Sequence, residues 1–134
     1  MERSRWLAVT SAVQLASDVA GFVIADRRRL PADPVGVHLH IPRTHMVRNS
    51  VLLGTGESAP LVMVAAQVWA TCRLMRGPDE TARKTLRALG AAMVGGYLIE
   101  RGSPLWPGHR EPWATAAFSV GLAGSAAMAA LARR

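Results

Sequence analysis

Residues 6–25 read WLAVTSAVQLASDVAGFVIA, an apolar segment that carries Gln14 and Asp18 in its interior. A helix rises about 1.5 Å per residue, so about 20 residues match the roughly 30 Å hydrocarbon core of a membrane. A carboxylate at the centre of a bilayer costs about 2.5 kcal/mol or more, so it normally faces the protein interior and has a function. The segment therefore predicts a transmembrane helix with a polar inner face.

A cleaved signal peptide is the alternative for this segment. Arg3 and Arg5 precede it, and residues 23–25 resemble a small-residue cleavage site. The apolar core of a signal peptide is normally free of charge, whereas this segment contains Asp18. We therefore favour a span that stays in the protein.

Three later segments also have helical length. The segment 50–72 contains Glu57 and Pro60, and a proline inside a helix removes a hydrogen bond and kinks the helix. The segment 82–101 follows Asp79 and Glu80, which suit a helix N-terminus, but its charge-free run of about 12 residues is short for a span. The last segment, 113–132, is apolar throughout.

Together the four segments predict an all-α fold, a four-helix antiparallel transmembrane bundle in one domain, residues 1–134. The expected spans lie at about 6–25, 50–72, 82–101 and 113–132. The first loop is long and proline-rich, and its residues 35–41 alternate as in a strand, so we expect it to be partly extended.

Four spans place both termini on one side of the membrane. The two sides carry nearly equal numbers of basic residues, so the positive-inside rule only slightly favours cytoplasmic termini. The use of Arg in place of Lys and the abundance of Ala are typical of a bacterial chain of high genomic GC content. The expected location is therefore a bacterial plasma membrane.

The composition supports the prediction of a membrane bundle but leaves a soluble helical bundle as the alternative. Half of the residues are hydrophobic and only 5% are aromatic, a bias towards small side chains that suits closely packed membrane helices. The net charge of +7 comes from basic residues at segment ends, where they meet lipid phosphates. No segment carries a basic stripe with aromatic residues between, so we expect no nucleic-acid binding. The single Cys72 excludes an intrachain disulfide.

Each predicted helix has a distinctive face at about 100° per residue. The polar residues of the first two helices gather on one face of each, namely Ser11, Gln14, Asp18 and Gly21, and then Asn49, Glu57, Pro60, Gln67 and Thr71. The third and fourth predicted helices carry small residues at a spacing of four, which lets helices approach closely. On the third they are Ala88, Ala92 and Gly96, followed at the same spacing by Glu100. On the fourth they are Ala117, Gly121, Ser125 and Ala129. We expect three helices to direct polar groups into a shared interior that the fourth closes.

Asp18, Glu57 and Glu100 are the predicted catalytic residues. Amides and hydroxyls hold membrane helices together at about 0.6 kcal/mol each, whereas a carboxylate is costlier to bury and is poorly explained as packing. In a water-poor pocket one acid can donate a proton while another accepts it. Glu57 is the first choice and Asp18 its counterpart, whereas an interfacial ion pair is the alternative for Glu100, which precedes Arg101.

The expected substrate is a lipophilic small molecule, because a cavity within a membrane admits such molecules. The matching reactions are double-bond isomerisation, proton-initiated cyclisation and epoxide opening. The residues predicted to bind the substrate are Gln14, Asn49, Gln67 and Tyr97. For Tyr97, a membrane-boundary anchor is the alternative to hydrogen-bond donation.

Two non-enzymatic functions remain open. Carboxylates on several helices could relay protons or balance a cationic solute in a small transporter, which for so short a chain would require a homo-oligomer. An accessory subunit that binds membrane lipid and a partner is the other possibility. Turnover by a single bundle would separate the enzyme from the transporter.

Metal and cofactor binding have little support. His38 and His40 project to the same side of a strand, and His45 could complete a three-nitrogen set, but solvated loop histidines are far commoner, so we predict no metal. The chain has no phosphate loop with its lysine, no dinucleotide fingerprint and no Gly-x-Ser-x-Gly elbow. We therefore expect no cofactor.

Overall fold

The computed structural model describes residues 2–28, 59–100 and 112–133 of the chain. These residues form four α-helices, in the order α1 (Glu2–Arg28), α3 (Leu61–Arg76), α4 (Glu80–Ile99) and α5 (Pro112–Leu131). The all-α, four-helix fold predicted from the sequence is confirmed. The predicted extended element at residues 35–41 lies outside the described residues, as do His38, His40 and His45.

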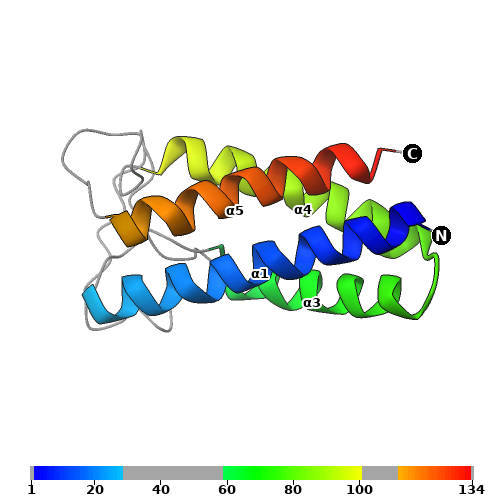
Figure 1. The fold of residues 1–134 in the computed structure, drawn as a ribbon, viewed down its shortest axis with the longest axis horizontal. Helices are drawn as coiled ribbons and strands as arrows, with labels where there is room; N and C mark the ends of the chain where they lie inside the picture. Colours follow the sequence, from blue (N-terminus) through cyan, green and yellow to red (C-terminus); the bar gives the residue numbers. More distant parts are fainter. Residues whose placement is uncertain (1, 29–58, 101–111, 134) are drawn as a thin grey trace.

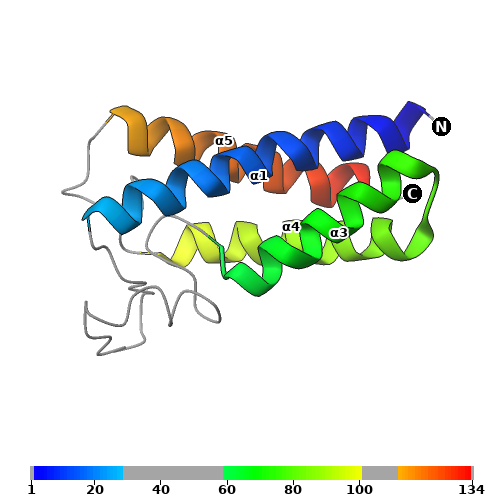
Figure 2. The same ribbon diagram turned by 90° about the horizontal axis from the view of Figure 1, so that it is seen from below.

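The four helices run alternately up and down (Figures 1 and 2). Both α1 and α4 pack against α3 and α5, so the helices form a ring in which α1 and α4 lie on one diagonal. The beginning of α1, the end of α5 and the α3–α4 connection lie together at one end of the bundle, which we call the terminal end (Figure 1). The antiparallel arrangement follows from the short connection at residues 77–79, which leaves α4 no path except back along α3.

The start of α4 matches the prediction from Asp79 and Glu80. The Asp79 side chain accepts a hydrogen bond of 2.8 Å from the backbone N–H of Ala82, and its backbone is extended, as in an N-cap. Glu80 occupies the first turn, where a negative charge interacts favourably with the helix dipole. Asp79 also pairs with Arg73 at 2.7 Å, which ties the beginning of α4 to the end of α3.

The predicted helix across residues 50–72 is wrong at its centre. Ala59 and Pro60 are not helical, and α3 begins only at Leu61, directly after Pro60. Proline lacks an N–H group and its ring clashes with the preceding turn, so it is tolerated at the start of a helix and not within it. Pro60 therefore precedes α3 and does not kink it.

The interior of the bundle is unusually polar. Ser11, Gln14, Asp18, Gln67 and Ser125 are each 1% exposed or less. An apolar cluster that includes Leu7, Leu74, Leu86 and Met128 fills the interior nearer the terminal end. The interior of the bundle is therefore apolar near the terminal end and hydrogen-bonded further from it.

The outer surface shows the opposite pattern. Large apolar side chains point outward along the helices, among them Trp6, Val9, Val13, Val19, Val62, Val68, Trp69, Leu98, Ile99, Trp113 and Val120, each more than 40% exposed. Soluble proteins rarely expose apolar surface on this scale, and they seldom fill their interiors with amides and a carboxylate. The outer surface of the described helices is thus more apolar, and their interior more polar, than in an ordinary soluble bundle.

Two of the helices are long and apolar enough to cross a membrane, over Glu2–Val23 and Pro112–Leu131. Helix α3 has only 16 residues, and α4 carries Arg83, Lys84 and Arg87 in its first half. The predicted spans at about 6–25 and 113–132 thus coincide with helices that fit a bilayer. The span predicted at 82–101 coincides with a helix of less apolar composition.

The inner face of α4 differs from the predicted one. Ala88, Ala92 and Gly96 are exposed, and nothing lies within 4 Å of a methyl group added at Gly96. The buried face is instead formed by Ala82, Leu86, Gly90 and Met93. Helix α4 must fill the space between α3 and α5, which needs large side chains, and Gly90 alone provides the close approach.

The predicted face of α5 is confirmed. Gly121 and Ser125 are buried, and Ala117 and Ala129 are half-buried at their edges. At Gly90, an added methyl carbon would lie 2.6 Å from the Ser125 carbonyl oxygen and 2.9 Å from the Ala129 nitrogen. The two helix backbones therefore touch at this point.

Candidate functional site

The predicted polar face of α1 lines the interior. Ser11, Gln14 and Asp18 lie about one turn apart and are all buried, as is Gly21 beyond them. Apolar residues such as Val9, Val13 and Val19 occupy the opposite side of the same helix. The periodicity of the first 25 residues thus placed Asp18 correctly inside the protein.

Helix α3 contributes Gln67 and Thr71 to the same core. The Gln67 amide nitrogen lies 2.6 Å from the Gln14 side-chain oxygen and 3.1 Å from the Ser11 hydroxyl. The hydroxyl of Thr71 donates a hydrogen bond to the carbonyl of Gln67. The hydroxyl oxygens of Ser11 and Thr71 are 2.7 Å apart. These contacts form a continuous series that joins α1 to α3 and runs from Thr71 towards Gln14.

Asp18 is held by a tyrosine from the far side of the ring. The Tyr97 hydroxyl of α4 donates a hydrogen bond of 2.9 Å to the Asp18 carboxylate oxygen Oδ1. Tyr97 was predicted as a substrate-binding residue, with a boundary anchor as the alternative, and its described contact is that of a hydrogen-bond donor. The contact joins α1 to α4 across the diagonal of the bundle, so it can form only when all four helices are assembled.

The Tyr97 ring is fixed by two residues of α5. Its plane meets the Phe118 ring edge to face, with the ring centres 5.3 Å apart and an interplanar angle of 87°. The hydroxyl and its ring carbon lie over Gly121, where any side chain would collide with them. The position of the donor at Asp18 is therefore set by packing, which is how a reactive group is held in one geometry.

Three polar side-chain atoms in this core are buried without a hydrogen-bond partner among the described residues. They are the Gln14 amide nitrogen, the Asp18 oxygen Oδ2 and the Gln67 amide oxygen. A buried polar group left unpaired costs about 1–3 kcal/mol, so such groups are rare in proteins and call for a physical reason. Here the three belong to neighbouring residues of one cluster and comprise one donor and two acceptors.

The remaining predicted site residues are not brought to Asp18 by any described contact. Glu57 and Asn49 lie outside the described residues. Glu100 directly follows the end of α4, is half-buried, and its backbone N–H bonds to the Gly96 carbonyl at 3.1 Å. The carboxyl group of Asp18 is thus the only one of the three that the described core contains.

Two core contacts were not foreseen. The Ser17 hydroxyl donates a 2.6 Å hydrogen bond to the Ala117 carbonyl and joins α1 to α5. The Met128 sulfur lies 3.5 Å from the Gln67 amide nitrogen. Ser17 lies three residues after Gln14 and four before Gly21, so its helical spacing places it on the polar face. Met128 gave no such signal, because methionine on a helix is ordinarily core packing.

No group of three or more His, Cys, Asp or Glu residues that could hold a metal ion occurs within the described parts of the chain. Among the described residues, this core offers one carboxyl, one phenol, two amides and the hydroxyls of Ser11, Thr71 and Ser125. A carboxylate with one oxygen bonded to a phenol and the other unpaired can take up a proton at the unpaired oxygen.

Comparisons of the chain with protein families, with curated proteins and with solved structures find no match.

Proposed function

We propose that this chain is a small integral membrane protein that performs acid–base chemistry on a lipophilic small molecule. The exposed apolar side chains and the buried polar side chains support the membrane location. Val13, at the middle of α1, is 51% exposed, whereas Asp18, little more than one turn along, is 1% exposed. In lipid this arrangement puts apolar groups against acyl chains and polar groups against one another.

The single observation that carries the proposed chemistry is the state of the Asp18 carboxyl group. Its Oδ1 accepts the Tyr97 hydrogen bond, whereas its Oδ2 is buried with no described partner. A carboxyl group meant only for structure would bury both oxygens in hydrogen bonds, because an unpaired one is destabilising. Asp18 thus has the form of a proton acceptor with its positioning donor already in place.

In the proposed reaction, Asp18 removes a proton from a carbon of the substrate and the same or a neighbouring acid returns a proton elsewhere. Double-bond isomerisation needs no more than this transfer. Cyclisation runs in the reverse order: an acid first protonates the substrate, and a base then removes a proton from the resulting cation. In epoxide opening Asp18 would instead take a proton from the attacking water while an acid protonates the epoxide oxygen. Gln14 and Gln67 would hold a polar group of the substrate through their unpaired amide atoms. Glu57 and Asn49 remain candidates for the second acid and a further contact.

The test compares lipid extracts of membranes isolated from cells that lack the chain and from cells that produce it or a variant, each incubated in D₂O after isolation. Wild type should form a lipophilic product with deuterium at a carbon position, and Asp18→Asn should lower its formation at least about 100-fold, the typical contribution of a general acid or base. Tyr97→Phe should lower it less, because Asp18 remains.

Ser17→Ala is the matched control. Ser17 is buried on the same helix and loses one hydrogen bond to Ala117, but it has no acid–base role. The control should keep its activity. Normal product formation by Asp18→Asn, with all variants present in the membrane at equal amounts, would end the enzyme proposal. Neutral or improved stability of Asp18→Asn with unchanged activity would identify Asp18 as packing.

The second candidate is proton-coupled transport by a homo-oligomer. It is favoured by the hydrogen-bond series from Thr71 through Ser11 and Gln67 to Gln14, which leads through the interior towards Asp18. Proteoliposomes loaded with a pH-sensitive dye would separate the two functions. Transport requires proton flux that Asp18→Asn abolishes and a stoichiometry above one chain, whereas an enzyme leaves the dye signal flat.

A further inference from the structure

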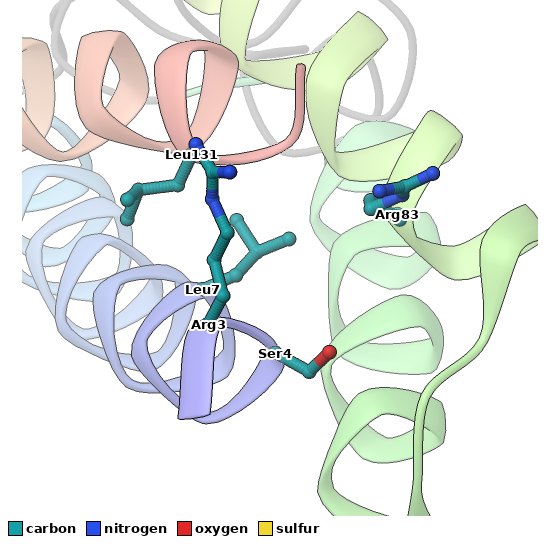
Figure 3. Close-up of a pocket in the computed structure, with 5 residues that line it drawn as sticks. All are labelled: Arg3, Ser4, Leu7, Arg83 and Leu131. Carbon is teal, nitrogen blue, oxygen red and sulfur yellow. The ribbon is translucent and has the colours of Figure 1, made fainter. Parts of the chain in front are cut away.

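A small hollow opens at the terminal end of the bundle (Figure 3). It is lined by residues of three helices, Arg3, Ser4 and Leu7 from α1, Arg83 from α4 and Leu131 from α5. Its volume is about 40 Å³. Pockets for drug-sized ligands measure roughly 300–1,000 Å³, so this hollow suits a compact group.

The polar lining of the hollow is cationic. Figure 3 shows Arg3 reaching from α1 towards Leu131 at the end of α5, with Arg83 on the other side of the hollow on α4. Ser4, next to Arg3 on α1, also lines the hollow and adds a hydroxyl group. Two arginines from different helices thus line one hollow, and arginine binds the oxygens of a phosphate group with paired hydrogen bonds.

Three acids are described at the terminal end: Glu2, in the first turn of α1 beside Arg3, and Asp79 and Glu80, which are engaged elsewhere. Asp79 caps α4 and pairs with Arg73, and Glu80 pairs with both Arg83 and Lys84. The Glu80–Arg83 pair lies on the surface, where solvent weakens it, and a guanidinium has five donors, so Arg83 can still bind a second anion. Further arginines crowd this end of the bundle: Arg5, Arg76, Arg87 and Arg133. The local field therefore attracts anions.

Leu7 limits how far a ligand in the hollow can reach into the bundle. Leu7 is 1% exposed and belongs to the apolar cluster with Leu74 and Leu86, so it separates the hollow from the polar core around Ser11 and Gln67. An anion in the hollow cannot reach Asp18. Beside it, the exposed Trp6 and the apolar flank of α1 offer a surface along which acyl chains can lie.

We propose that this hollow binds the phosphate group of an anionic ligand through Arg3, Arg83 and Ser4. A phospholipid headgroup and free inorganic phosphate share this chemistry. The site is separate from the proposed acid–base function, because it uses none of the residues of the polar core.

The experiment measures binding to the full-length protein in detergent by native mass spectrometry. Three probes are added in turn: phosphatidylglycerol, phosphatidylcholine and inorganic phosphate. Phosphatidylglycerol should bind with a stoichiometry of one and at least about tenfold more tightly than phosphatidylcholine, which has the same phosphate but adds a choline cation that the arginines repel. Binding of inorganic phosphate alone, at the same stoichiometry and with the same arginine dependence, would support the site with phosphate from solution as its ligand.

The variants test the two arginines directly. Arg3→Gln and Arg83→Gln should each weaken binding about tenfold, and Glu80→Gln should strengthen it because Arg83 loses its competing partner. Arg76→Gln is the matched control, since it removes the same charge at the same end but does not line the hollow. Equal weakening by all three arginine variants would mean general electrostatic attraction and would overturn the proposal, as would failure of wild type to bind any phosphate.

Discussion

The hydroxyl of Tyr97 lies directly over Gly121, and this contact decides whether the Asp18–Tyr97 hydrogen bond can form. An alanine at position 121 would place a methyl group on the hydroxyl and its ring carbon. We expect Gly121→Ala to displace Tyr97 from Asp18 and to lower the free energy of unfolding by about 1–3 kcal/mol, as overpacked cores do. Unfolding in mixed SDS micelles would measure this loss.

A double variant identifies the cause. In Gly121→Ala with Tyr97→Phe the overlapping hydroxyl is gone, so the combined loss of stability should be smaller than the sum of the two single losses. Gly96→Ala is the control, because nothing lies within 4 Å of a methyl group there. It should be neutral or slightly stabilising, since alanine is the better helix former. Strictly additive losses would show that Gly121 and Tyr97 are not coupled.

For single residues, the sequence predicts well which side chains of α1 face the interior and poorly which side chains of α4 do so. Gln14 and Asp18 stand alone among apolar neighbours, so their helical spacing fixes the inner face. Tyr97 sits in a run of small and apolar residues, where several faces are possible. Its bond to Asp18 spans 79 positions and depends on where α5 presents Gly121, which no local pattern contains.

Helices α4 and α5 touch through their backbones at Gly90. A methyl carbon there would come within 2.6 Å of the Ser125 carbonyl oxygen, and a backbone atom cannot move aside as a side chain can. Gly90→Ala should therefore separate the helices and cost about 3 kcal/mol or more, at the upper end of overpacking effects. Gly95→Ala, on open surface of the same helix, should cost nothing. Thermal unfolding of both variants in one detergent would decide, and equal midpoints would contradict the close contact.

The beginning of α4 should make stability sensitive to acid. The Ala82 N–H bond and the Arg73 guanidinium hold the pKa of Asp79 below its ordinary value. Its contribution to stability is therefore complete above the ordinary pKa of about 4 and is lost as the pH falls through the lowered pKa. Wild type should exceed Asp79→Asn in stability at neutral pH, because asparagine keeps the cap but loses the ion pair.

The pH dependence of this difference is the measurement. Unfolding midpoints of the two proteins should converge as the pH is lowered below about 4. A difference that stays constant from pH 7 to pH 3 would mean that the Asp79 charge does not stabilise the fold.

Helix boundaries were predictable where a residue type forces them. Asp79 begins α4 by capping it, and Pro60 prevents α3 from starting earlier. The predicted face of α4 was wrong because small residues at a spacing of four occur on its outside, whereas a single glycine makes the close contact on its inside. Spacing alone does not distinguish the two, since both are compatible with helix packing.

Across the described bundle, many large apolar side chains lie on the outer surface while a cluster of polar side chains is buried inside, and this arrangement can be tested directly. Val13 is exposed near the middle of α1. Val13→Lys should lower the amount of protein in the membrane and weaken insertion by about 2.5 kcal/mol or more, as for a charge in a bilayer. Alkaline extraction of membranes followed by immunoblotting would measure it.

The opposite result would favour the soluble bundle. If Val13→Lys is folded and soluble without detergent, with unchanged thermal stability, the outer surface faces water. Arg5→Lys, near the start of α1, is the control and should leave insertion unchanged because it keeps its charge.

The up-and-down path of the chain has a practical consequence. Helix α1 starts, and helix α5 finishes, at the same end of the bundle (Figure 1). Two copies expressed in tandem through a short flexible linker would thus keep the same topology, so one gene could encode a pair of fixed stoichiometry. A mutated copy joined to an intact one would then reveal whether each bundle works alone.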